Sequence, residues 1–207
     1  MAKKKNIEVK IIWGLLTAIF AAFLVYPVLL LLVKSFQSDG GIGLVNYVEM
    51  FRTKGFVQSV KNSFLISGLS AVITTTFAFL MAYTIHYTNV PKGYKKAVRT
   101  LAVLPMLLPT ITYGFAIIYS FGKQGLFTRI FGRQLFDIYG VSGLLIGYVI
   151  YTLPVSFLLI HNTMGYIDKK FMVVSRVMGD GRFKAFMATI FRPLTGTLAV
   201  SLSLINI

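Results

Sequence analysis

Histidine and cysteine are the side chains that most often bind metals or act as nucleophiles, and this sequence holds few of them. It has two histidines and no cysteine. The absence of cysteine excludes disulfides, thiolate nucleophiles and cysteine-ligated metals. His86 and His161 each stand alone at the end of an apolar run. We therefore interpret them as interfacial residues and expect neither a metal site nor a bound cofactor.

The polar residues inside the long apolar runs are neutral, so none of them could carry a coupled proton or ion. Most of their hydroxyls are predicted to form hydrogen bonds between helices. Some could instead line a pathway, and prolines could act as hinges because each removes a backbone donor. The candidates for a pathway or hinge are Thr75, Pro105, Pro109, Thr112 and Pro154.

The segment 163–193 carries the most informative pattern. A short, nearly all-apolar helix is predicted from Phe171 to Met178, ended by Gly179, because glycine tolerates the left-handed conformation that stops helices. Such a helix on the water side needs a partner. A second helix is predicted along the membrane surface from an apolar stripe, with Pro193 turning the chain into the last span. The stripe consists of Phe183, Phe186, Met187, Ile190 and Phe191.

Four apolar runs are long enough to position these residues as membrane helices, since a bilayer core needs roughly 20 residues of helix. They cover residues 11–33, 62–86, 100–121 and 141–160. A fifth run from Leu194 to Ile207 is too short to cross, so we expect the sequence to stop inside a membrane helix. The prediction is an all-α polytopic transmembrane bundle of one domain, 1–207, truncated within the fifth span.

A short amphipathic helix is also predicted between the first two spans. Leu44, Tyr47, Val48 and Phe51 recur at helical spacing there.

Composition supports a membrane protein. The chain is 56% hydrophobic and only 13% charged, whereas about a quarter of residues are charged in soluble domains. The net charge is +15. The basic residues lie between the apolar runs and form no stripe interleaved with aromatic residues, so we expect no nucleic-acid partner. The amino terminus and loops 87–99 and 163–193 hold most Lys and Arg residues. The positive-inside rule places these three segments, including the amino terminus, in the cytoplasm.

The sequence resembles the binding-protein-dependent permeases of ABC importers. Their cytoplasmic loop begins Glu-Ala-Ala, has a Gly six residues after the Glu, and continues into an aromatic-rich helix and a proline. Gly179, Phe186, Arg192 and Pro193 match this motif, but Val173 stands where the Glu is expected. Further matches in the family's order are Gly43-Leu-Val-Asn-Tyr47, Asn62-Ser63, Ala82-Tyr83, Leu104-Pro105 and Leu108-Pro109.

The resemblance implies a type I ABC importer permease of the bacterial cytoplasmic membrane, not an enzyme. It implies alternating access driven by a separate ATPase, because the chain has no phosphate-binding loop motif. A solute-binding protein, periplasmic or lipid-anchored, and a second permease copy or homologue are the other expected partners. The residues expected to couple to the ATPase are Phe171, Val174, Ser175, Arg176, Met178 and Gly179.

Within the family, the pattern is most similar to permeases for ferric iron, polyamines, thiamine and 2-aminoethylphosphonate. The substrate stays open, with 2-aminoethylphosphonate slightly favoured.

Two other classes of function would require residues that this sequence does not show. A secondary transporter or channel would be expected to show an ionisable midplane residue or a filter sequence. A membrane anchor subunit of an enzyme complex would often carry haem-ligating histidines within its helices. The residues present favour the permease over both.

Overall fold

The computed structural model describes residues 2–38 and 40–205, with side chains from residue 7 onward, and the chain divides into two units after Val60. The regular structure described is helical apart from one pair of very short strands. The elements follow in this order: α1 (Ala2–Phe20), a π-turn (Ala21–Val25), α2 (Tyr26–Ser35), β1 (Gln37–Ser38), β2 (Gly41–Ile42), α3 (Val45–Arg52), α4 (Phe56–Tyr87), α5 (Lys92–Val103), a 3₁₀ turn (Leu104–Leu107), α6 (Thr110–Phe121), α7 (Leu126–Phe131), α8 (Val141–Tyr166), α9 (Lys170–Val177), α10 (Arg182–Phe186), a π-turn (Met187–Phe191) and α11 (Arg192–Ile205).

The first unit is built on one long apolar helix. α1, the π-turn and α2 run on without a break, and the part from Ile7 to Ser35 is long and apolar enough to cross a membrane. Within the chain itself, the side chains of this helix are exposed from residue 7 to residue 34. A surface this apolar is stable only against lipid or another protein.

The amphipathic helix predicted between the first two spans is confirmed as α3. It is tied to the end of α2 by Tyr47, whose hydroxyl lies 2.6 Å from Ser35 Oγ and whose ring lies 5.3 Å from that of Phe36. Asn46 Nδ2 donates to the carbonyls of Ser35 and Gln37. The Ser35 carbonyl is one of those that the end of α2 leaves without an intrahelical partner, and Asn46 supplies a donor for it.

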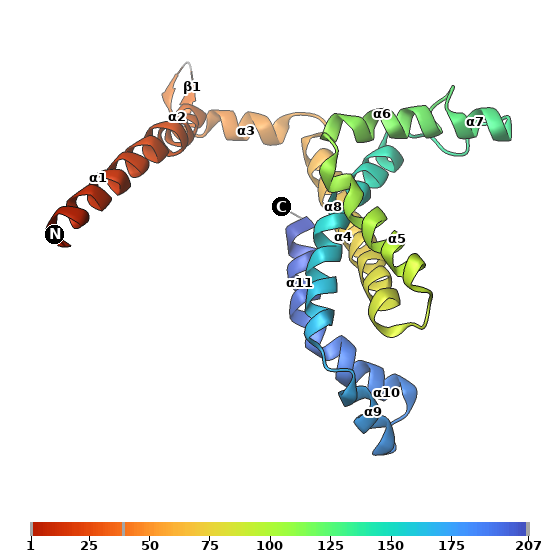
Figure 1. Ribbon diagram of the computed structural model, residues 1–207. Helices are drawn as coiled ribbons and strands as arrows, with labels where there is room; N and C mark the ends of the chain where they lie inside the picture. Colours follow the sequence, from red (N-terminus) through yellow and green to blue (C-terminus); the bar gives the residue numbers. More distant parts are fainter. Residues whose placement is uncertain (1, 39, 206–207) are drawn as a thin grey trace. The chain divides into compact units, whose positions relative to one another are not determined.

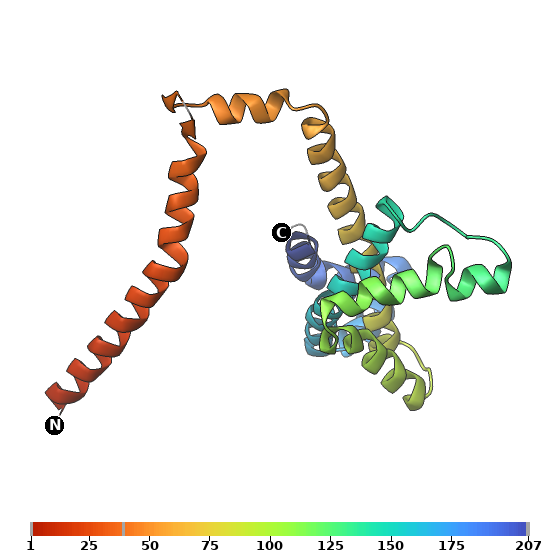
Figure 2. The same ribbon diagram turned by 90° about the horizontal axis from the view of Figure 1, so that it is seen from above.

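The second unit is a bundle in which α8 lies beside α5, α6 and α11 (Figures 1 and 2). Its core joins four helices through side chains that are at most 1% exposed. Small residues from α4 and α5 let the backbones approach, and larger ones from α8, the second π-turn and α11 fill the space between them. The fully buried members are Ala78, Ala82, Ala102, Phe157, Ile160, Met164, Ile190 and Leu194.

Three predicted spans are confirmed as helices long and apolar enough to cross a membrane. The runs 11–33, 62–86 and 141–160 lie within Ile7–Ser35, Phe56–Tyr87 and Val141–Tyr166. The fifth predicted run was expected to be too short to cross, but its described part belongs to the helical stretch Arg182–Ile205, which is long and apolar enough to cross a membrane because it begins well before Leu194. The last two residues of the run fall outside those described. The all-α membrane fold predicted from the sequence is therefore confirmed.

The third span is not the continuous helix predicted for residues 100–121. Helix α5 and the 3₁₀ turn end at Leu107, and α6 starts at Thr110 after a bend of 113°. Leu108 is extended, as a residue before proline tends to be, because the proline ring disfavours helical geometry there. The Tyr113 hydroxyl donates to the Pro105 carbonyl, and it lies 3.2 Å from the Leu108 carbonyl.

Pro193 does not turn the chain, which corrects a second expectation. Helix α10, the π-turn and α11 form one uninterrupted helical stretch. A proline clashes with the carbonyl four residues before it and gives that carbonyl no donor. The carbonyl in question belongs to Thr189, inside the π-turn, where the wider coil relieves the clash. In the first unit, Pro27 stands two residues after the π-turn Ala21–Val25, just as Pro193 stands two residues after the π-turn Met187–Phe191.

The two prolines at the bend provide a test of this account. Replacing both Pro105 and Pro109 with Leu restores two backbone donors and removes the ring clashes, so α5 and α6 should extend toward one straight helix. Because a helix rises 1.5 Å per residue, spin labels on cysteines at Lys96 and Tyr119 should move apart by roughly 15 Å. The distance can be measured by electron paramagnetic resonance, since the chain has no native cysteine.

Pro154→Leu is the matched control for that experiment. Pro154 lies inside α8 with no break at that point, so its replacement should leave the distance from 96 to 119 unchanged. An unchanged distance in the Pro105, Pro109 double variant would show that contacts with α8, and not the prolines, produce the bend.

Candidate functional site

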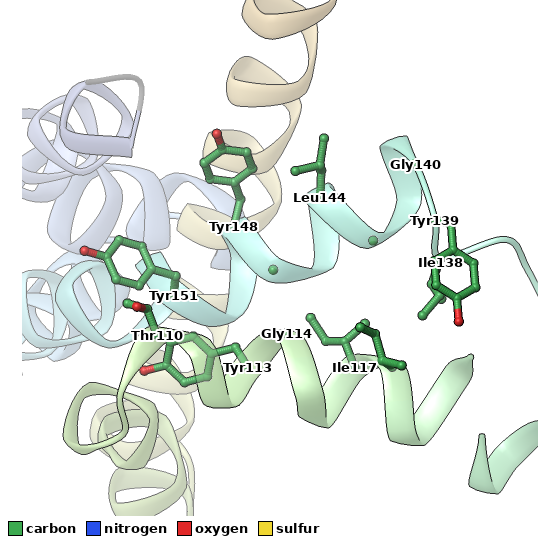
Figure 3. A pocket seen from close by; sticks show the side chains of 13 residues that line it. Thr110, Tyr113, Gly114, Ile117, Ile138, Tyr139, Gly140, Leu144, Tyr148 and Tyr151 are labelled. Carbon is green, nitrogen blue, oxygen red and sulfur yellow. The ribbon is translucent and has the colours of Figure 1, made fainter. Parts of the chain in front are cut away.

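The break in the third span adjoins two grooves beside α8. One has a volume of about 610 Å³ between α6 and α8, and its apolar wall includes Gly114, Gly143 and Gly147. Figure 3 shows Ile117 of α6 pointing toward α8, with Tyr113 of α6 and Tyr151 of α8 near one another at one end of the groove. A Cβ on Gly114 would meet open space, and one on Gly147 would contact Ile117 Cδ1 at 3.8 Å. Gly143 has a different role, because a Cβ there would clash with the Ile138 backbone carbonyl.

The second groove has a volume of about 420 Å³ and lies on the other side of Tyr113 and Tyr151. Met106 and Leu108 from the bend line it, together with Pro154 and Ser156 of α8. Both grooves share Thr110, the first residue of α6. The lining is mostly apolar with a few hydroxyls, which suits a passage that offers hydrogen bonds without binding a charge.

The predicted pathway and hinge residues do not all gather at these grooves. Pro154 is buried in the lining of the second groove, whereas Pro105 and Pro109 form the bend itself. The Thr112 amide donates to the Pro109 carbonyl in the first turn of α6. Thr75 lies elsewhere, buried, with its hydroxyl 3.1 Å from Ser201 Oγ of α11. Its contact is the helix-to-helix bond that the sequence predicted for most hydroxyls.

A second candidate site is the loop around α9, which presents an apolar surface. Five of its apolar side chains are more than half exposed: Phe171, Val173, Val174, Val177 and Met178. The inner face of α9 is formed by the half-buried Met172, which packs on the bundle core, and by buried Ser175. Arg176 is exposed. An apolar helix face left open to this extent indicates a binding surface.

The end of α9 is fixed by a specific turn. Gly179 has φ +89°, as the sequence predicted for the residue that stops this helix. The amides of Gly179 and Asp180 donate to the carbonyls of Arg176 and Ser175. This is the pairing of a Schellman turn, in which glycine takes the left-handed position. A residue with a side chain would be strained there.

Side chains brace the same turn. Ser175 Oγ donates to Asp180 Oδ2 at 2.7 Å, and Lys184 Nζ of α10 lies 2.7 Å from Asp180 Oδ1. The hydrogen bonds from Lys184 and then from Ser175 hold the pKa of the Asp180 carboxyl below its ordinary value of 3.8. The carboxylate is therefore charged at neutral pH, and it joins the end of α9 to the start of α10.

The sequence did not reveal one further cluster of polar side chains. His86 and His161, interpreted as separate interfacial residues, are in contact: His86 Nε2 lies 2.9 Å from His161 Nδ1. Arg99 lies 2.6 Å from the other ring nitrogen of His161. The two histidines are 75 residues apart, and no local spacing signals such a contact. Among the described residues, no three His, Cys, Asp or Glu side chains could share a metal ion.

The geometry defines a polytopic helical membrane protein with an exposed apolar helix, α9, at the end of its bundle. No known family profile matches the chain. It is 25% identical over 191 residues to a ferric transport system permease protein of Haemophilus influenzae, a match that covers 89% of this chain and 30% of that protein. It is also 25% identical over 144 residues to the molybdenum transport system permease protein of Escherichia coli, covering 67% of this chain and 60% of that one.

A solved structure shares the fold of this chain. A bacterial alginate ABC transporter in complex with a periplasmic protein that holds an alginate pentasaccharide superposes on 98% of this chain with a TM-score of 0.80, at 19% identity. The match covers 72% of that structure's chain. The chain thus has the fold of an ABC importer permease. The proteins to which its sequence is similar are transport system permeases, as the loop motif had indicated. It spans about 30% of the length of the ferric relative.

The brace at the end of α9 can be tested by removing its buried hydroxyl. In Ser175→Ala, Asp180 loses one of its two side-chain donors, and the turn should open more often. A lost hydrogen bond typically contributes about 1 kcal/mol, so hydrogen exchange of the Gly179 and Asp180 amides should accelerate roughly fivefold. The measurement is exchange followed by mass spectrometry on the chain in lipid.

Lys184→Ala is the matched control because it removes the exposed partner of the same carboxylate. Lys184 is 77% exposed, and exposed ion pairs contribute little. Exchange of the two amides should change less in this variant than in Ser175→Ala. The reverse order would show that the ion pair, and not the buried hydroxyl, holds the turn.

Proposed function

We propose that this chain is the pore-forming permease subunit of an ABC importer, which moves a small solute across the bacterial cytoplasmic membrane. Transport would proceed by alternating access, with the energy supplied by a separate cytoplasmic ATPase. The sequence relatives and the shared fold support this class of protein.

The observation that carries the proposal is the exposed apolar face of α9. Val174 is 53% exposed and Val177 is 83% exposed, so this face is stable in water only when a protein covers it. The proposed partner is a groove of the ATPase, and Phe171 and Met178 flank the contact. The Schellman turn at Gly179 sets the direction in which α9 meets that groove.

The other proposed partners follow from the same class. A solute-binding protein, periplasmic or lipid-anchored, would deliver the solute, and a second permease copy or a homologue would complete the pore. The alginate transporter in the structural comparison was solved with its periplasmic binding protein. The exposed first span, Ile7–Ser35, offers a surface for lipid or for the second permease.

Ferric iron and 2-aminoethylphosphonate are the solutes proposed for testing first. The relative from Haemophilus influenzae, which is named as a ferric transport permease, supports the first of them. Among the described residues, no charged side chain lines the apolar grooves at the bend, so charge selection is assigned to the binding protein.

The coupling role of α9 predicts the effect of a charge on its exposed face. In Val174→Asp, the carboxylate would be buried without a partner in the ATPase groove, at a cost of about 3 kcal/mol or more. That corresponds to a roughly hundredfold loss of affinity. Co-purification of the ATPase should fail, or ATP hydrolysis should continue without uptake, while membrane insertion stays normal.

Val174→Leu is the matched control, because it changes the shape of the residue and keeps the contact apolar. It should retain most ATPase binding and uptake. If Val174→Asp also retains both, α9 is not the coupling helix and the proposal loses its main support.

The proposed orientation predicts the labelling of two exposed lysine positions on either side of the bent span. With the amino terminus in the cytoplasm, a cysteine at Lys96 should react only with a reagent on the cytoplasmic side. A cysteine at Lys123 should react only from outside, provided that α5 and α6 together cross the membrane. Reaction of both from one side would mean that the bent pair is a re-entrant loop.

A further inference from the structure

A chain of hydrogen bonds joins three helices at one end of the bundle. Arg99 of α5 lies 2.6 Å from His161 Nε2 of α8, and His161 Nδ1 lies 2.9 Å from His86 Nε2 of α4. His161 is only 5% exposed, and its ring stacks on Phe157 with a centroid separation of 5.2 Å. The bonds therefore add polar links between helices that share an apolar core and, between α4 and α8, the Thr74–Thr152 hydroxyl pair.

The chemistry of arginine determines where the protons lie. A guanidinium can only donate, so Nε2 of His161 must accept and carries no proton. A neutral imidazole then has its proton on Nδ1, which donates to Nε2 of His86. His86 in turn must carry its own proton on Nδ1. Both rings are neutral in this arrangement, and both have the same tautomer.

The other groups around the pair are cationic or neutral. Lys95 of α5 donates to the carbonyls of Ile85 and Thr88, next to His86. Lys169, after α8, lies 5.8 Å from the centre of the Tyr87 ring. The carboxylate of Asp168, which precedes Lys169 in the sequence, accepts a hydrogen bond from the Lys170 amide and not from either imidazole. Among the described residues, no carboxylate bonds to either imidazole, so nothing there compensates an added positive charge.

One added proton cannot be accommodated without breaking a bond. If it binds His161, Nε2–H points at the Arg99 donor. If it binds His86, the new Nε2–H of His86 faces Nδ1–H of His161. A change of tautomer in His161 removes that conflict, but it moves the His161 proton to Nε2, where it faces the Arg99 donor. Every arrangement with three protons on the four ring nitrogens therefore places two donors against each other.

We propose that His86, His161 and Arg99 form a proton-sensitive tie, which is intact while both rings are neutral and opens when the pair takes up one proton. Opening disconnects α8 from α5 or from α4 at this end of the bundle. Histidine is the side chain suited to such a response because it titrates near physiological pH. The inference concerns the fold itself and does not depend on the proposed transport function.

The tautomers test the proposal directly, because the sequence contains only these two histidines. The full chain is prepared in lipid bilayers with ¹⁵N-labelled histidine and a tag that has no histidine. Near neutral pH, nitrogen chemical shifts should show both rings protonated at Nδ1 and unprotonated at Nε2. A ring protonated at Nε2 under those conditions would overturn the proposal without any variant being made.

Two variants separate the tie from a general effect of charge. Arg99→Met removes the donor that fixes the first tautomer, so His161 should become a mixture of both. Lys96→Met removes a neighbouring, exposed positive charge from the same helix and should leave both tautomers as they are. Equal effects of the two variants would contradict the assignment of Arg99.

The opening is measured between labels on cysteines at Lys96 of α5 and Asn162 of α8, two exposed positions. When the pH is lowered until the rings are protonated, the distance distribution should broaden or shift to longer values. A His86→Gln, His161→Gln variant has no ring to titrate, so its distribution should not respond. A response that persists in this variant, or rings that take up protons while the distance stays fixed, would show that the cluster is not a tie.

Discussion

Backbone hydrogen bonding inside the bilayer is the constraint on which this structure depends, because lipid offers no partner for an exposed amide or carbonyl. Prolines remove donors, and their positions coincide with most irregular points in the described helices. Pro27 and Pro193 follow π-turns, whereas Pro105 and Pro109 produce the bend. At the bend, the Tyr113 hydroxyl takes over as a donor to backbone carbonyls. Local geometry therefore changes so that polar groups remain paired.

The packing of the bundle follows from the same constraint. Apolar side chains gain little by leaving lipid for a protein core, so close packing and hydroxyl pairs hold the helices together. Three such pairs join different helices: Thr74 with Thr152, Thr75 with Ser201, and Thr163 with Thr197. Thr152 also donates to the Tyr148 carbonyl of its own helix, which leaves its oxygen to accept from Thr74.

Sequence reasoning succeeded where a local pattern determines the outcome. Helix α3 follows from helical spacing, the end of α9 from Gly179, and three spans from uninterrupted apolar runs. It failed at the third span and at Pro193 because a proline can kink, break or merely widen a helix, and the neighbouring turns decide which. It also missed His86 and His161, since a contact between residues 75 positions apart depends on how α4 and α8 pack. The two grooves beside α8 were missed for the same reason, because they lie between helices.

The continuity of α10 with α11 bears on how a loop could act on the membrane part of the chain. A turn at Pro193 would have allowed α9 to move without moving the bundle. Instead, the Schellman turn and the Ser175–Asp180–Lys184 brace join α9 to a helical stretch that runs from Arg182 to Ile205. Along that stretch, Ile190 is buried in the core and Ser201 bonds to Thr75. A force applied to the exposed face of α9 would therefore reach α4 through rigid, packed elements, as the proposed coupling requires.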